Sequence, residues 1–132
     1  MAWSAHNTLL TQQALRAIGE LNARGGDRPA ALEALRRVTR RFGESGNVAE
    51  QHQTIISMLD PLVAMGEFTA AATICGALSS TPWHNTFTYR TIDKTVGDRL
   101  DRDRHLAARR AGQAMSPADL VLYTSRLVRE LR

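Results

Sequence analysis

Apolar residues recur every three or four positions along most of this chain, which is the spacing that places them on one side of an α-helix. The pattern predicts helices over about residues 4–23, 28–42, 48–64 and 67–78. Farther along the chain it predicts helices over about residues 89–103, 105–113 and 117–131. No stretch favours a strand, since the short apolar run at 54–58 lies within a longer helical period. The sequence therefore predicts an all-α fold.

Local signals mark where several of these helices begin. Asp27, Asn47 and Ser116 each stand just before a predicted helix, where a side-chain oxygen accepts a backbone N–H that has no partner within the helix. Asp119, three residues after Ser116, adds a negative charge to the first turn, where the positive end of the helix dipole favours it. Pro61 lies inside the predicted helix at 48–64 and is expected to kink it.

A faint repeat sets the expected architecture. Residues 26–35 resemble residues 66–75 at an offset of about 40 residues, and each copy follows an amphipathic helix. Units of helix, glycine turn and helix bury their apolar faces only by stacking on neighbours. The sequence thus favours antiparallel helix-pair repeats, a TPR-like fragment of an α-solenoid with capping helices at its C-terminal end. Such a stack offers a surface to another molecule rather than a catalytic pocket.

The repeats suggest how the chain is organised. We expect its 132 residues to form a single helical domain. Residues 1–79 would hold two helix-pair repeats, residues 80–87 a loop rich in Ser, Thr, Pro and Asn, and residues 88–132 the C-terminal helices.

Composition narrows the expected core and compartment. Aromatic residues make up only 5% of the chain against 43% hydrophobic residues, so the core must rest on Ala, Leu, Ile and Val. The single cysteine excludes an internal disulfide framework and is compatible with a reducing compartment. We find neither a long apolar run nor the pattern of a signal peptide, so a cytoplasmic protein without membrane contact is expected.

The net charge of +4 comes almost wholly from arginine. Four arginines at helical spacing form a candidate nucleic-acid stripe that could follow a line of phosphates: Arg36, Arg37, Arg40 and Arg41. The solvated outer face of a repeat helix is the alternative we favour, and an arginine-rich composition is also typical of GC-rich genomes. The mixed charges at 90–110 indicate a salt-bridged surface helix instead.

No residue pattern indicates catalysis, a metal or a cofactor. His6, His52, His84 and His105 lie far apart and lack the spacing of metal ligands. Cys75 lies on the apolar face of an alanine-rich helix, where cysteine usually packs as a small hydrophobe. We therefore expect a protein that is not an enzyme.

Two groups of residues are candidate interfaces. Aromatic and imidazole rings gather in and after the loop, and such rings with arginine nearby dominate interface energies: Trp83, His84, Phe87 and Tyr89. The alternative is that these rings fold back and plug the end of the stack. The final helix carries a broad apolar face that could meet a second copy of the chain: Leu120, Tyr123 and Leu127.

The order of these pieces resembles a known family. The pieces are Gly26 with Asp27, the alanine-rich residues 71–78, Pro82, the charged residues 88–100 and the motif at 112–116. In this order they are similar to the C-terminal helical-repeat region of actinobacterial LuxR-type transcriptional regulators and adenylate-cyclase-like signal-transduction ATPases. The chain departs from that family in having no GxxxxGK nucleotide-binding loop and no terminal helix-turn-helix. None of the family's catalytic or DNA-binding residues has a counterpart.

These observations lead to one leading hypothesis and one alternative. The first is a non-enzymatic protein–protein interaction module of a bacterial signalling or transcriptional regulator, which binds a protein partner or itself, as in a homodimer. The alternative is a small basic helical protein that binds nucleic acid through the arginine stripe, a reading that the mixed charges elsewhere disfavour.

Overall fold

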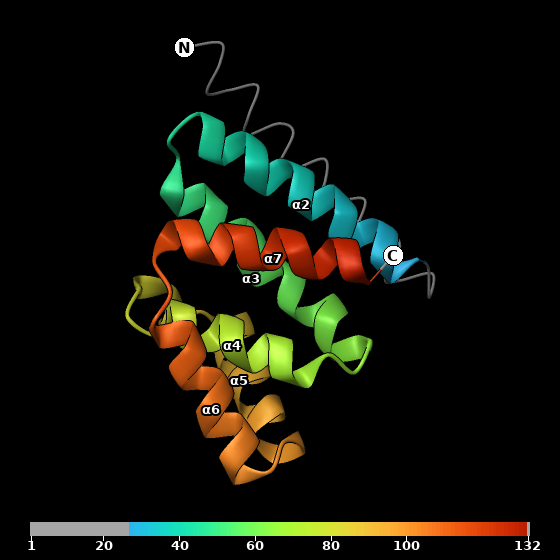
Figure 1. Cartoon of the computed structure of the whole chain (residues 1–132), viewed down its shortest axis with the longest axis vertical. Helices are drawn as coiled ribbons and strands as arrows, with labels where there is room; N and C mark the ends of the chain where they lie inside the picture. The colour runs from blue at the N-terminus through green and yellow to red at the C-terminus, as the bar shows by residue number, and fades with distance from the viewer. Residues whose placement is uncertain (1–26, 132) are drawn as a thin grey trace.

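The structure is a computed structural model that describes residues 27–131. The predicted helix at residues 4–23 lies outside this part. The described chain is helical and contains no strand, as the sequence predicted (Figure 1). It consists of α2 (Arg28–Glu44), α3 (Val48–Ala64), α4 (Phe68–Leu78), the short 3-10 turn η1 (Pro82–Asn85), α5 (Phe87–Arg99), α6 (Arg102–Gln113) and α7 (Pro117–Glu130).

The predicted N-caps are confirmed. The Asp27 carboxylate accepts the backbone N–H three residues on at 3.1 Å, and Asn47 caps α3 in the same way. At the start of α7, Ser116 Oγ accepts the Asp119 N–H while the Asp119 carboxylate accepts the Ser116 N–H, both at 3.1 Å. Pro61 lies in the last turn of α3, which continues to Ala64.

The predicted helix over 89–103 is wrong at its end. α5 stops at Arg99, because Leu100 adopts an extended backbone and Asp101 caps α6 by accepting the Arg104 N–H at 2.9 Å. An aspartate side chain competes well for free helical N–H groups, so it can start a new helix within an apparently continuous periodic pattern.

The core is built around α3 and α4 and is completed by α2 and by the later helices. Leu59 and Leu62 of α3 are fully buried, as are Ile74 and Leu78 of α4. Ile92 of α5 adds to the same cluster. The core is aliphatic, as the low aromatic content indicated.

Two glycines allow α4 and α6 to pack almost backbone to backbone. A Cβ atom at Gly112 of α6 would lie 1.9 Å from the Thr73 carbonyl oxygen of α4, and one at Gly76 would lie 2.3 Å from the Arg109 carbonyl oxygen. Real Cβ atoms do not come this close to a backbone oxygen. The contact therefore requires glycine on both helices, and it fixes where the chain turns into α7.

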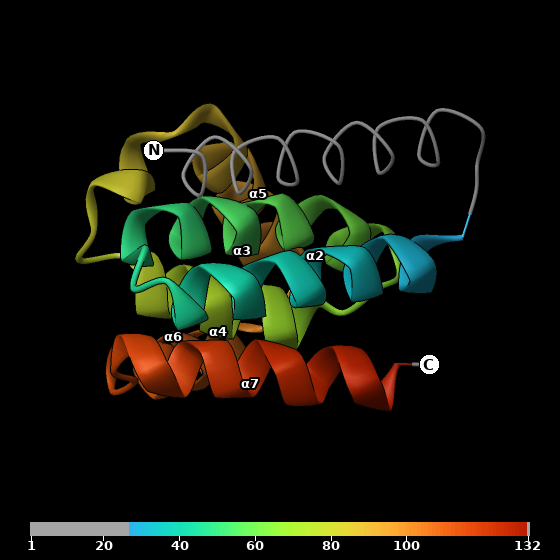
Figure 2. The ribbon, with the colours of Figure 1, turned by 90° about the horizontal axis from the view of Figure 1, so that it is seen from above.

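The last helix returns to the beginning of the described chain. α7 packs along α2 and also contacts α3 and α4, and it flanks the α2–α3 pair in Figure 2. Its apolar face turns into the chain's own core: Leu120 is 2% exposed and Val128 is 1% exposed. Tyr123 and Leu127 are partly buried against the same cluster. This placement corrects the expectation that Leu120 is offered to a second chain, because the chain's own core covers it, whereas Tyr123 and Leu127 are only partly covered.

Candidate functional site

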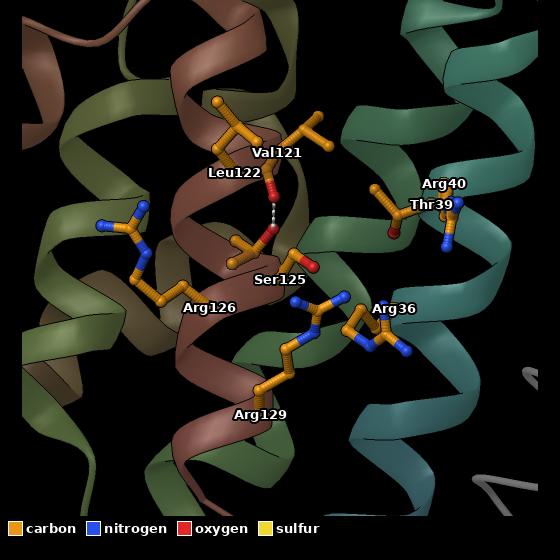
Figure 3. A pocket seen from close by; sticks show the side chains of 9 residues that line it. Arg36, Thr39, Arg40, Val121, Leu122, Ser125, Arg126 and Arg129 are labelled. Atoms are coloured by element: carbon orange, nitrogen blue, oxygen red, sulfur yellow. Dashed lines mark hydrogen bonds between the residues drawn. The ribbon is translucent and has the colours of Figure 1, made fainter.

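A groove runs between α2 and α7, with a volume of about 380 Å³ (Figure 3). We call it the α2/α7 groove. It combines cationic, hydroxyl and apolar side chains from both helices. Its lining residues are Arg36, Thr39 and Arg40 of α2, and Val121, Leu122, Thr124, Ser125, Arg126 and Arg129 of α7.

Arg36 is the fixed cation of the groove. Its Nε donates to Glu33 Oε2 at 2.8 Å and its Nη2 donates to Glu33 Oε1 at 2.5 Å. This hydrogen bonding raises the pKa of Arg36 further above its ordinary range, so the guanidinium stays charged. Its side chain is only 13% exposed, and the pairing holds it in one position.

α7 supplies cations of a different kind. Arg126 and Arg129 are exposed, and neither forms an ion pair within residues 27–131. Figure 3 shows the guanidinium of Arg129 directed toward Arg36 across the groove, whereas Arg126 points away from α2. Two positive groups from separate helices thus approach each other. Such an arrangement favours an anion between them.

The other end of the groove is apolar. Val121 points toward α2, and Leu122 is 64% exposed, which is unusual for a leucine on a helix that is otherwise well packed. The Thr124 hydroxyl is not free to donate to a ligand, since it already donates to the Val121 carbonyl at 3.0 Å. The groove therefore offers apolar contact and positive charge side by side, which is typical of surfaces that bind protein segments.

The four arginines of the predicted stripe all line a second hollow, an outer hollow along α2. Arg36 and Arg40 also line the α2/α7 groove, so these two arginines belong to both hollows. The outer hollow also holds Glu44, whose carboxylate lies 3.6 Å from Arg40 Nε. Arg37, with Nε 3.4 Å from Glu33 Oε1, and Arg41 line only this outer hollow. Acidic side chains thus interrupt the stripe.

Sequence reasoning missed the α7 half of the groove. Leu122, Arg126 and Arg129 stand four and three residues apart, so they share one side of a helix. That spacing was visible in the sequence. Only the packing of α7 against α2, which joins residues about 90 apart in the chain, brings Arg129 to Arg36.

The four loop residues separate into two pairs. Trp83 packs partly buried against the core, and Tyr89 is 4% exposed, with its hydroxyl donating to the Cys75 carbonyl at 2.8 Å. The rings of Trp83 and Tyr89 are thus turned into the core, as in the alternative in which they fold back onto the helices. His84 is exposed, and Phe87 is 85% exposed at the start of α5. Only the second pair is available to another molecule.

The cysteine lies in a chemically quiet setting. Burial, with a smaller contribution from Asp93, raises the pKa of Cys75 from 9.0 to about 12, so the thiol stays protonated at neutral pH. Arg109 of α6 pairs with Asp93 of α5 nearby and joins the two helices. His84, Tyr89 and this ion pair line a hollow of about 400 Å³ with further cations. A protonated, buried thiol is a poor nucleophile.

No metal centre emerges from the described residues. Among residues 27–131, no group of three or more His, Cys, Asp and Glu side chains could hold a metal ion. The Nε2 atom of His105 is buried without a hydrogen-bond partner in this part of the chain, but it stands apart from other ligand-type side chains.

The chain matched no protein-family model, curated protein or solved structure when compared with them. Its resemblance to the helical-repeat region of LuxR-type regulators stays a prediction from the order of the motifs. No helix among residues 27–131 is long and apolar enough to cross a lipid bilayer.

Proposed function

We propose that this protein is a docking module that binds a segment of a partner protein in the α2/α7 groove. The observation that supports this most is the approach of Arg129 to Arg36 across a groove whose other end exposes Leu122. Arginine is enriched among the residues that dominate binding energies between proteins, and the apolar contact beside it helps to exclude water. In this proposal the chain performs no chemistry and acts by bringing partners together.

The helix arrangement is compatible with a TPR-like module. α5 packs on α3 and α4, while α6 packs on α4, so the later helices stack on the helices that precede them. On this proposal α7 is the capping element, and its outer side becomes part of the binding surface. Membership in a regulator of the LuxR or signal-transduction ATPase type is part of the proposal and rests on the order of sequence motifs. A second copy of the chain, as the alternative partner, would bind through exposed residues such as Leu122 or Phe87.

The nucleic-acid alternative rests on the arginines of α2. Glu33 and Glu44 lie among them, and a carboxylate beside a guanidinium repels a phosphate. The exposed Leu122 gains little from a phosphate backbone. A protein segment uses both parts of the groove, so the docking function is the better account.

Affinity capture with matched variants tests the proposal. The tagged chain is used to capture proteins from a nuclease-treated lysate of its own organism, beside L122D and the control L106D. Leu106 of α6 is also exposed, at 41%, and does not line the groove. We expect a set of proteins that survives nuclease treatment, is retained by L106D and is lost with L122D.

Two results would contradict this function. If L122D and L106D capture the same proteins, the α2/α7 groove is not the binding site. Recovery that depends on nucleic acid, and that disappears when Arg36, Arg37, Arg40 and Arg41 are replaced by glutamine, would favour the alternative, because those replacements remove the phosphate contacts and their salt dependence.

A further inference from the structure

The two ends of the α2/α7 groove favour different groups on the same ligand, a negative charge at one end and an apolar side chain at the other. We infer that its occupant is an amphipathic helix carrying an acidic side chain about two turns from an apolar one. The carboxylate would lie between Arg36 and Arg129, and the apolar side chain would lie on Val121 and Leu122. This inference rests on the docking function proposed above and specifies the partner.

The charge argument begins with Arg36. Glu33 occupies Nε and one N–H of Nη2, so further N–H groups of the guanidinium remain to donate. Arg129 has no ion pair within residues 27–131, and all its donors are open. A carboxylate between them would accept from both and would relieve the repulsion of two like charges. Ser125, which also lines the groove, adds a hydroxyl on the same side.

Preorganisation favours this position. Glu33 already holds Arg36 in place, so little side-chain freedom is lost there when an anion binds. Arg129 alone must become ordered. Binding of the acidic peptide should therefore depend strongly on Arg129, while Arg36 provides a positive charge that is already in position.

The spacing argument concerns α7. Leu122 and Arg129 are seven residues apart on one helix, which corresponds to about 10 Å along its axis. A partner helix lying along α7 places residues i and i+7 on one side at the same separation. The groove lies between two helices packed side by side, and laying an apolar helix side into such a groove is a recurring mode of peptide recognition. No sheet edge exists among residues 27–131 to receive an extended segment.

Selection from a peptide library tests the inference. A display library of helix-forming peptides of about 20 residues, long enough to be helical, is randomised on one side and selected on the full chain. We expect the selected peptides to share an Asp or Glu seven residues from a Leu, Ile, Met or Phe. Their affinity should fall about tenfold or more for R129E, because a favourable pair becomes a repulsive one. It should be unchanged for R102E, a charge reversal at an exposed arginine of α6.

Charge reversal in the peptide completes the test. Replacing the selected acidic residue by lysine should abolish binding to the natural chain and restore binding to R129E. Restoration by the complementary swap is not expected if R129E merely disturbs the fold. Arg129 is exposed, and circular dichroism of each variant gives an independent check.

The outcomes separate the inference from the function on which it rests. Peptides that lose binding with L122D but share no acidic residue would overturn the inference and leave the docking function standing. An acidic residue at a spacing typical of an extended peptide would also overturn it. Peptides whose affinity is unchanged by L122D and by R129E would overturn both the inference and the docking function. A selection that yields no binding peptide would have the same consequence. A fluorescent DNA duplex that binds and is lost with R129E, where no peptide binds, would do the same.

Discussion

Single glycines decide how closely two helices of this protein approach. Gly76 and Gly112 stand at the contact of α4 with α6, where a methyl group would meet a carbonyl oxygen at 2.3 and 1.9 Å. Gly97 of α5 is the contrasting case, because its added Cβ would lie 3.6 Å from His105 Cε1, an ordinary contact. The same substitution should therefore have opposite effects at these positions.

We predict that Gly112→Ala lowers the free energy of unfolding by at least about 1–3 kcal/mol, since the backbones must move apart. Gly97→Ala should leave it unchanged or raise it by about 0.5–1 kcal/mol, because alanine favours the helix. Urea denaturation followed by circular dichroism measures both. Equal effects at the two positions would contradict the close packing of α4 on α6.

The buried thiol gives a second residue-scale prediction. Cys75 should resist a thiol reagent in the folded protein at pH 8 and react at a rate set by unfolding, because its folded pKa is raised to about 12. The unfolded thiol ionises more readily, near its ordinary pKa of 9.0. The stabilisation from keeping the thiol neutral is therefore complete below about pH 9 and declines as the pH rises toward 12.

Reaction kinetics in native buffer and in urea, together with denaturation at several pH values, check this prediction. Rapid labelling of the native protein would place Cys75 at the surface and contradict the burial described here. The sequence predicted a packed cysteine from its alanine-rich, apolar surroundings. It did not reveal Asp93 and Arg109, which come from two later helices.

At the scale of elements, the start of α7 determines whether the groove exists. Ser116 and Asp119 fix the first turn of α7 by reciprocal hydrogen bonds, and the rest of the helix lies along α2. Weakening this cap should loosen one wall of the groove. The cap is also one of the clearest signals in the sequence.

We predict that Ser116→Ala lowers the free energy of unfolding by about 1 kcal/mol, the usual loss for an N-cap serine. Ser57→Ala is the matched control, because Ser57 lies inside α3 and its hydroxyl donates only to the Gln53 carbonyl at 3.2 Å. Its effect should be near zero, since alanine is the better helix former. A loss at Ser57 as large as that at Ser116 would argue against the cap as the cause. Urea denaturation of both variants measures the difference.

Elements were predictable where a cap and an apolar period agreed. The helices starting after Asp27, Asn47 and Ser116 follow this rule. The rule failed at Asp101, because the apolar period ends at Leu100 and the predicted helix was continued through the charged residues to 103, across the cap that divides α5 from α6. Periodicity reports which side of a helix is buried, but it does not report where hydrogen bonding is interrupted.

At the scale of the whole molecule, the path of α7 is the feature that the sequence could not supply. An apolar helix face is equally suited to another copy of the chain and to the chain's own core. The structure places Leu120 and Val128 in the core and leaves Leu122 outside. The surface that we propose for binding is therefore not the apolar face of α7 but the edge of this helix that lines the α2/α7 groove.

The same long-range contact explains why only half of the candidate site was predicted. Arg36 and Arg40 belonged to a stripe visible on one helix, which we interpreted as a solvated outer face, with nucleic-acid binding as the alternative. Arg129 supplies the second positive charge of the groove, and the sequence did not show that it lies near Arg36, because the two residues are far apart along the chain. Local spacing identifies faces, whereas a groove between helices depends on topology.

Crosslinking in the cell tests the central proposal, that the α2/α7 groove holds a partner protein. A photoreactive phenylalanine analogue replaces Leu122 in the full chain, with Leu106 replaced in the same way as the control. We expect a discrete protein adduct at position 122 that is absent at position 106 and is lost when R129E is added. No adduct at position 122, or the same adducts at both positions, would contradict the proposal.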